Sequence, residues 1–339
     1  MKKDSIKKVM KYKPPIYISL MVIIMAFLLF LYISSNHNSY AIEKSIEFSD
    51  TMELITTDTI TSDALNVDNK QIPGLIVYKS SSNGYQNFSL NNKYNYSNNY
   101  TKTNKLEDIG LNYILSNSYP NKNFVDNNGK SIDDSFQTWI TQVSIWLYLY
   151  EKEVSTNGNI DENSPYYLSD DVIYSIKNSK KLINKNKEFK ADDTIYNTYI
   201  KKLVENALIT NNKETVLDYF KEDKLYSTID NKYYQTSEIK VITNESENFK
   251  GYKISVPEGV KVVNQEGNNI DSNTILDVTD TFYIRIPKNK KESNRKTELT
   301  ITGIFSNIEG YIYRSEGYKD IVIFGNKDSE ITSKFNIKI

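Results

Sequence analysis

The hydrophobic residues between Ser131 and Lys152 recur every three or four positions. This spacing predicts a helix with one buried face. Asp133 and Asp134 place carboxylates near its positive N-terminal end, and Ser131 with Asp134 forms a candidate capping box. The apolar positions of the stripe are Phe136, Trp139, Ile140, Val143, Trp146, Leu147 and Tyr150.

Gln142 stands on the edge of this apolar stripe, between the two tryptophans of the protein, Trp139 and Trp146. A carboxamide in a partly dry site must find hydrogen-bond partners or take part in chemistry, because burying it unpaired is costly. Gln142 is therefore the first candidate site residue.

The neighbouring motifs resemble the thioester domain of Gram-positive bacterial surface adhesins. The resemblance rests on Tyr119-Pro120-Asn121, on Phe136 and on Thr141-Gln142-Val143-Ser144-Ile145-Trp146. In that family a tyrosine-proline turn precedes a helix with a TQxAIW-like motif, and the glutamine is condensed with a cysteine of an earlier strand. The resemblance implies this scaffold for roughly residues 70–339. The chain contains no cysteine and has Ser144 at the alanine of the motif, so the site is degenerate and the thioester cannot form.

The resemblance also suggests a position for the missing cysteine. In the family the cysteine follows an aromatic residue on an early strand and precedes a polar loop, and Tyr78-Lys79 has this order. Two alternatives stay open: Gln142 is kept for packing and hydrogen bonding, or Lys79 forms an amide cross-link with it. The cross-link needs a desolvated, deprotonated lysine. The residues expected to line the site are Tyr78, Trp139, Thr141 and Trp146.

The N-terminal region predicts export. Residues 1–14 hold six lysines and one aspartate, and we interpret them as a basic cytoplasmic segment. Residues 15–34 are predicted to be a transmembrane anchor or signal sequence, since the apolar run 16–33 spans roughly 27 Å as a helix. Cleavage after Ala41 stays open, and the protein would then be secreted.

The rest of the chain divides into a linker with the first strand or strands (35–71), a thioester-domain-like region with a helical insert (72–235) and a β-rich part of the same domain (236–339). Residues 91–104 are predicted to be a loop. The expected fold class is α+β: an antiparallel β-sandwich or barrel carrying an inserted helical bundle, preceded by one N-terminal transmembrane helix. Besides the central helix, helices are expected over 105–115, 169–187, 193–209 and 214–221. Strands are expected over 238–242, 252–256, 260–263, 281–286, 297–302, 310–313, 320–324 and 331–339.

Composition excludes several classes of chemistry. Without cysteine there are no disulfides, thiolate metal sites or cysteine nucleophiles, and a single histidine, His37, excludes histidine-dependent triads and multi-histidine zinc sites. After residue 14 the chain holds 36 Lys and Arg against 42 Asp and Glu, an acidic balance that argues against nucleic-acid binding. We predict no metal and no cofactor.

Paired carboxylates are the remaining candidates for catalysis. Asp133-Asp134, Asp170-Asp171 and Asp192-Asp193 all stand where predicted helices begin, so interaction with the helix dipole explains them. A carboxylate-dependent extracellular hydrolase stays an alternative. The expectation is a non-enzymatic, adhesin-like surface module, anchored in the cell membrane with its C-terminal domain outside. It would bind an extracellular protein or envelope partner without covalent chemistry.

Overall fold

The computed structural model describes residues 48–62, 75–80, 86–92, 95–211, 215–246, 248–288 and 296–338. The predicted basic segment, the membrane segment and Ala41 lie outside these residues. In the described ranges, no helix is both long enough and apolar enough to cross a membrane. The membrane anchor therefore stays a prediction.

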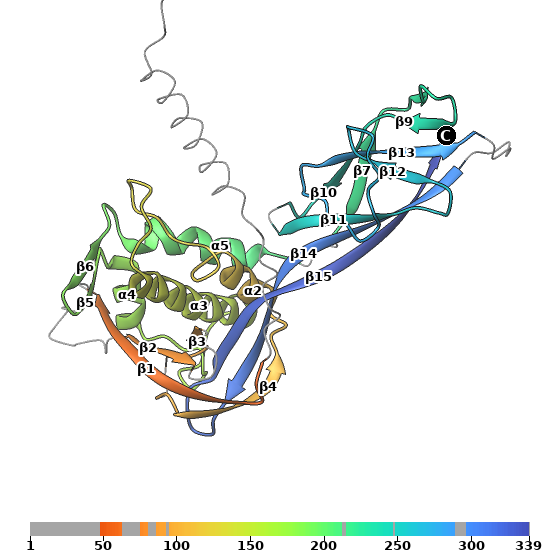
Figure 1. Ribbon diagram of the computed structural model, residues 1–339. Coiled ribbons are helices and arrows are strands. Elements are labelled where there is room, and N and C mark those ends of the chain that lie inside the picture. The colour runs from red at the N-terminus through yellow and green to blue at the C-terminus, as the bar shows by residue number, and fades with distance from the viewer. Residues whose placement is uncertain are drawn as a thin grey trace, which may run out of the picture. The chain divides into compact units, whose positions relative to one another are not determined.

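Two long antiparallel strands organise the described fold. They are β14 (Lys296–Arg314) and β15 (Ile321–Lys338), and they pair continuously from Lys296 opposite Lys338 to Tyr313 opposite Ile321 (Figure 1). The first half of β14 also pairs with β11 (Phe249–Ser255), and its last residues pair with β4 (Asn99–Lys105). The ribbon thus belongs to two different packing environments.

At one end of the ribbon, β11, β14 and β15 share an apolar core with a second sheet. In the described residues this sheet has six strands, in the order β7-β10-β13-β9-β8, with β12 paired to β13. Its strands are β7 (Leu217–Lys221), β8 (Leu225–Ser227), β9 (Tyr233–Thr236), β10 (Ile239–Thr243), β12 (Lys261–Val263) and β13 (Thr281–Pro287). Alternating residues such as Phe282, Ile284 and Ile286 point into the shared core.

At the other end, β14 and β15 belong to a sheet with the strand order β3-β15-β14-β4-β1-β5-β6. Within the described residues this sheet has nine strands, because β11 also pairs with β14 and β2 also pairs with β1. β3 occupies the edge of this order and pairs only with β15 along it. The remaining strands are β1 (Thr51–Ser62), β2 (Leu75–Ser80), β3 (Asn87–Ser89), β5 (Lys181–Asn184) and β6 (Lys187–Lys190).

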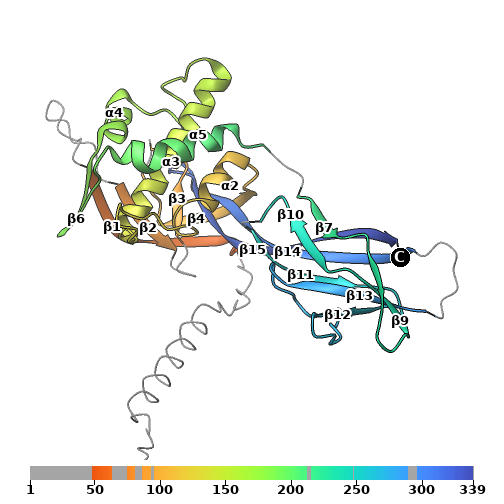
Figure 2. The ribbon, with the colours of Figure 1, turned by 90° about the horizontal axis from the view of Figure 1, so that it is seen from above.

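The helices follow β4 in the sequence and precede β7. They are α2 (Ile109–Ser116), α3 (Asp134–Asn157), α4 (Asp170–Asn178), the short π-helix η2 (Tyr196–Ile200) and α5 (Lys201–Ile209). Figure 2 shows α3 and α5 beside each other, and α3 also contacts β1, β2 and β5. α3 is buried on nearly all sides from Phe136 to Leu149. The α+β class is therefore confirmed.

Helix α3 has a side-chain cap at its N-terminus and a glycine cap at its C-terminus. The Asp133 side chain accepts a hydrogen bond from the Ser135 amide, so Asp133 is the N-cap. Gly158 takes the left-handed conformation with φ 78° and ends the helix. The predicted capping box at Ser131 is wrong: Ser131 lies before the cap, and its hydroxyl accepts from Gln137.

Several expected elements differ from the structure. Residues 99–105 form β4 rather than a loop and a helix start, because they pair with β1 and β14. The helix expected to reach residue 187 ends at Asn178 and is followed by the β5–β6 hairpin. The helix expected over 214–221 is wrong, since β7 pairs with β10 from Leu217 to Lys221. The four strands expected between 297 and 339 are the two continuous strands β14 and β15.

Candidate functional site

The carboxamide of Gln142 lies against the edge strand β3. Gln142 is 2 % exposed. Its Oε1 accepts a hydrogen bond from the Ser89 amide at 2.8 Å, and its Nε2 donates to the Ser89 carbonyl at 2.7 Å. The side-chain amide of Gln142 thus pairs with both backbone groups of Ser89, as the backbone of a neighbouring strand would.

The geometry of β3 explains why Ser89 is available for this pairing. Ser89 stands opposite Ile321 of β15, and the next residue, Leu90, donates its amide to Asp320 at 2.8 Å. In an antiparallel pair, hydrogen-bonded and non-hydrogen-bonded residues alternate. The amide and carbonyl of Ser89 therefore point away from β15, toward the sheet edge, where Gln142 satisfies them.

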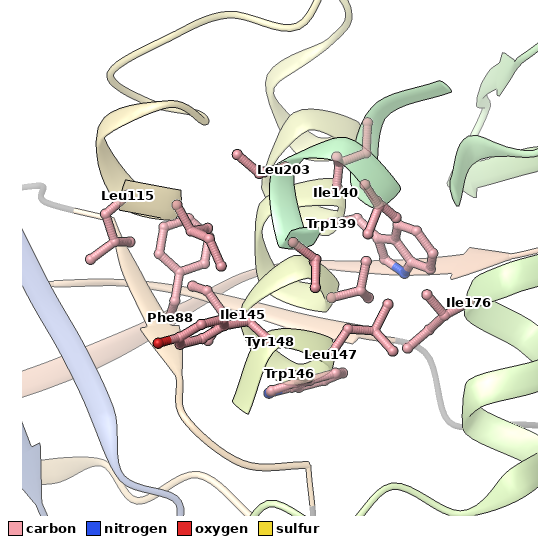
Figure 3. Packing of buried hydrophobic residues seen from close by; sticks show 14 of the residues in the cluster. Phe88, Leu115, Trp139, Ile140, Ile145, Trp146, Leu147, Tyr148, Ile176 and Leu203 are labelled. Atoms are coloured by element: carbon pink, nitrogen blue, oxygen red, sulfur yellow. The ribbon is translucent and has the colours of Figure 1, made fainter. Parts of the chain in front are cut away.

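Trp146 strengthens the same contact from the next turn of α3. Its Nε1 donates to the Ser89 carbonyl and to the Ser89 hydroxyl, each at 3.1 Å. Figure 3 shows Trp146 in one packed core with Phe88 of β3 and with Ile145. Trp139 is buried in that core too, one turn before Gln142. Helix α3 is thereby joined to β3 by hydrogen bonds inside an apolar cluster.

Thr141 connects α3 to the tyrosine-proline turn. Its hydroxyl donates to the Tyr119 carbonyl at 3.3 Å, and the Tyr119-Pro120 bond is cis. Burial, together with the negative charge of Asp134 and a hydrogen bond to it, raises the pKa of Tyr119 to about 12. The two sequence motifs of the resemblance are therefore in contact, although they are separated by 22 residues.

The structure places Ser89 against Gln142. Lys79 lies in β2 opposite Ile55, and Tyr78 lies opposite Thr56, but the side chains of β2 are outside the described part. The Lys79–Gln142 cross-link stays a prediction. Ser89 was missed, although it also follows an aromatic residue, Phe88, on an early strand and precedes a polar stretch. That order is the signal that could have found it.

Two further buried polar groups lie near this contact. Lys319 is 8 % exposed, and burial lowers the pKa of its amine to about 8. Its Nζ is 5.3 Å from the centre of the Trp146 ring and 4.8 Å from that of Tyr96. Asn91 is 5 % exposed, and its Oδ1 finds no hydrogen-bond partner among the described residues. Neither residue was singled out from the sequence.

The Ser89–Gln142 contact is suited to holding structure rather than to nucleophilic chemistry. A serine hydroxyl is a weak nucleophile unless a base takes its proton, and Trp146 donates to the Ser89 hydroxyl instead of accepting from it. In the described residues, no group of three or more His, Cys, Asp or Glu side chains is arranged to hold a metal ion.

The carboxylate pairs have partners that fit their positions at helix starts. Asp133 caps α3 and accepts from Lys187 at 2.6 Å. Asp170 and Asp171 lie in the first turn of α4. Asp193 accepts from the Thr194 amide and from Asn197. Asp133 thus caps α3, and the other two pairs lie in or just before the first turn of a helix, where the helix dipole favours negative charge.

Comparison with known proteins supports the resemblance at the level of the fold. The structure is similar to that of the Bacillus anthracis TIE protein, with a TM-score of 0.51 and 19 % identity, over 85 % of this chain and 49 % of that one. It is also similar to the thioester domain of the Enterococcus faecium TIE86 protein, with a TM-score of 0.50 and 14 % identity, over 87 % and 98 % of the two chains. No protein-family model and no curated protein matches the sequence.

The described chain therefore has the fold of a thioester domain of Gram-positive bacteria. It spans about half the length of the Bacillus anthracis protein to which it is similar. The helix with the motif glutamine is present, the sequence contains no cysteine, and Ser89 lies against the glutamine.

Proposed function

We propose that this chain is a cell-surface interaction module that binds its partner without forming a covalent bond. The observation that carries the proposal is the Ser89–Gln142 pairing. Gln142 is the glutamine of the thioester-domain motif, and its side-chain amide is intact and makes two hydrogen bonds to the Ser89 backbone. Such an amide is far less reactive toward amines than a thioester.

Non-enzymatic binding fits the remaining features of the described residues. The carboxylate pairs act at helix starts, and the buried Gln142 is closed off by β3. We therefore propose recognition through surface contacts with an extracellular protein or an envelope component. The proposed place of action is the outer side of the cell membrane, with residues 16–33 as the anchor.

Two measurements on the full chain in detergent micelles test this function. Incubation with methylamine is expected to leave the protein mass unchanged, because no activated carbonyl is present. Binding to candidate host and envelope proteins, followed by biosensor, is expected to saturate and to reverse completely on washing. Wild-type protein incubated without methylamine is the control for the mass measurement.

Three results contradict the proposal. The first is incorporation of methylamine at Gln142. The second is a partner complex that survives boiling in detergent. The third is catalytic turnover of a glycan, which supports the hydrolase alternative instead.

A further inference from the structure

The outer face of the second sheet carries a row of polar side chains that crosses four strands. Arg285 of β13 stands opposite Lys261 of β12 on one side and opposite Gln235 of β9 on the other (Figure 1). Gln235 in turn stands opposite Tyr226 of the edge strand β8. Neighbouring strands lie about 4.8 Å apart, so the row from Lys261 to Tyr226 spans about 14 Å.

These side chains point away from the core, because residues of a strand alternate between its two faces. In β13, Ile284 and Ile286 are buried in the core of the second sheet, whereas Tyr283 and Arg285 are partly exposed. By the same alternation Tyr233 of β9 shares the outer face. We call this surface the tyrosine-arginine face; its members are Tyr226, Tyr233, Gln235, Lys261, Tyr283 and Arg285.

The guanidinium group of Arg285 is held in place and still has donors to spare. Its Nε donates to the Gln235 Oε1 at 2.7 Å, and its Nη1 donates to the Gly267 carbonyl at 3.4 Å. A guanidinium group carries five N–H donors, so three of them, including both on Nη2, find no partner among the described residues. Arg285 is thus oriented by neutral groups and can bind an anion.

Within the described residues, no carboxylate forms an ion pair with either cation of this face. The Lys261 Nζ lies 5.1 Å from the centre of the Tyr233 ring. Asp230, in the turn between β8 and β9, accepts hydrogen bonds from the Thr228 hydroxyl and the Lys232 amide instead. The charges of the face therefore complement a ligand that carries carboxylates, which an arginine fork binds well.

The tyrosines give the face an aromatic component beside its charges. Tyr226 is 51 % exposed at the end of the row, and Tyr283 lies two residues before Arg285 on the same strand. A tyrosine ring offers an apolar surface against which the C–H side of a sugar ring can pack, and its hydroxyl can exchange hydrogen bonds with sugar hydroxyls.

We propose that the tyrosine-arginine face binds a polysaccharide whose sugar units carry carboxylate groups. Arg285 and Lys261 pair with the carboxylates, and Tyr226 packs against a sugar ring. Partner residues that dominate protein–protein interfaces typically insert into well-packed pockets, whereas this row lies along the surface of a sheet. An extended sugar chain is therefore favoured over an acidic protein segment. The inference rests on the proposed function, because it names the class of extracellular component that the module binds.

Binding of the full chain, in detergent micelles, to immobilised hyaluronate and polygalacturonate tests this inference in a biosensor. Saturable and reversible binding to at least one of these polysaccharides is expected, and neutral dextran, as the control, should not bind. Added salt is expected to weaken the binding, because ion pairs at a protein surface are screened by salt.

Variants assign the binding to this face. Arg285→Gln is expected to lower the affinity by about tenfold or more, because it removes a charge-assisted contact. Tyr226→Ala changes an exposed side chain and is expected to lower the affinity by about threefold or more. The matched control, Lys130→Gln, removes one positive charge from the exposed turn before α3 and is expected to leave the affinity unchanged. Circular dichroism checks folding, and Tyr226→Ala decides the matter if Arg285→Gln does not fold.

Several results would overturn the inference. They are no binding to either acidic polysaccharide, equally tight binding to dextran, and an affinity that stays the same in folded Tyr226→Ala. Tighter binding to poly-glutamate than to either polysaccharide also overturns it, in favour of an acidic protein segment. If only this inference fails, reversible binding to another extracellular partner persists, whereas incorporation of methylamine contradicts the proposed function itself.

Discussion

Replacing Gln142 with alanine is expected to destabilise the fold, because it uncovers the backbone of β3 inside the protein. In the wild-type protein, the Ser89 amide donates to Gln142, and the Ser89 carbonyl accepts from both Gln142 and Trp146. In the Gln142→Ala variant, the amide loses its partner and the carbonyl keeps only the indole.

The magnitude follows from these contacts. A buried donor without a partner costs about 1–3 kcal/mol. The partly relieved carbonyl and the removed side-chain atoms, left as a small cavity, bring the total to about 2–5 kcal/mol. For a domain of this size, 1 kcal/mol corresponds to a Tm change of about 2–4 °C, so a loss of about 3 kcal/mol lowers Tm by about 6–12 °C.

Urea unfolding followed by tryptophan fluorescence measures this loss, since both tryptophans lie in α3. Gln142→Met is the matched control, because it fills a similar volume without hydrogen bonds. It is expected to lose most of the same free energy, which separates the hydrogen bonds from the cavity. The reasoning is refuted if Gln142→Met is as stable as the wild-type protein, or if Gln142→Ala loses less than about 1 kcal/mol.

Two other predictions concern the junction of α2 and α3. Burial alone would raise the pKa of Asp108, but hydrogen bonds from Lys152, Tyr148 and the Leu111 amide hold it below the usual value. Asp108 thus adds stability at neutral pH that is lost as the pH falls below about 4. The difference in free energy of unfolding between the wild-type protein and Asp108→Asn, measured by urea titration, should therefore become smaller below this pH. A difference that stays constant with pH contradicts this prediction. Gly110→Ala should lower the free energy of unfolding by about 1–3 kcal/mol in calorimetry, because the added Cβ would overlap the Tyr148 ring. Replacing a glycine in a helix by alanine usually stabilises the helix, so a higher Tm would show that the ring moves aside freely.

The sequence predicted the position of the central helix well because its apolar residues recur with a 3.6-residue period. The prediction of a single buried face was wrong, since every residue from Phe136 to Leu149 is buried. Strands β10, β12 and β13 of the second sheet were also predicted closely, since alternating apolar residues leave a two-residue period. Strand β7 was predicted as a helix, and β8 and β9 were not predicted. The long ribbon was predicted as four shorter strands, which in the structure are the two continuous strands β14 and β15. In the structure, Gly303 provides room for the Phe305 and Phe249 rings within the strand.

Other elements depend on contacts that are distant in sequence. Residues 99–105 are polar and become a strand through pairing with β1 and β14. Ser89 became recognisable only when its backbone was found opposite Gln142, because the local order of residues fits Tyr78-Lys79 as well as Phe88-Ser89. A short edge strand carries little periodic signal, and its partner on a helix 53 residues away cannot be identified from spacing.

The most direct test of the central claim is to supply the missing sulfur at Ser89. In the Ser89→Cys variant, the thiol is expected to displace ammonia from Gln142, and the resulting thioester is expected to incorporate methylamine, as measured by mass spectrometry of the peptide containing Gln142. Neither Lys79→Cys nor the double variant Ser89→Cys with Gln142→Ala should incorporate it. A folded Ser89→Cys protein whose thiol stays free, or incorporation in Lys79→Cys, would contradict the account.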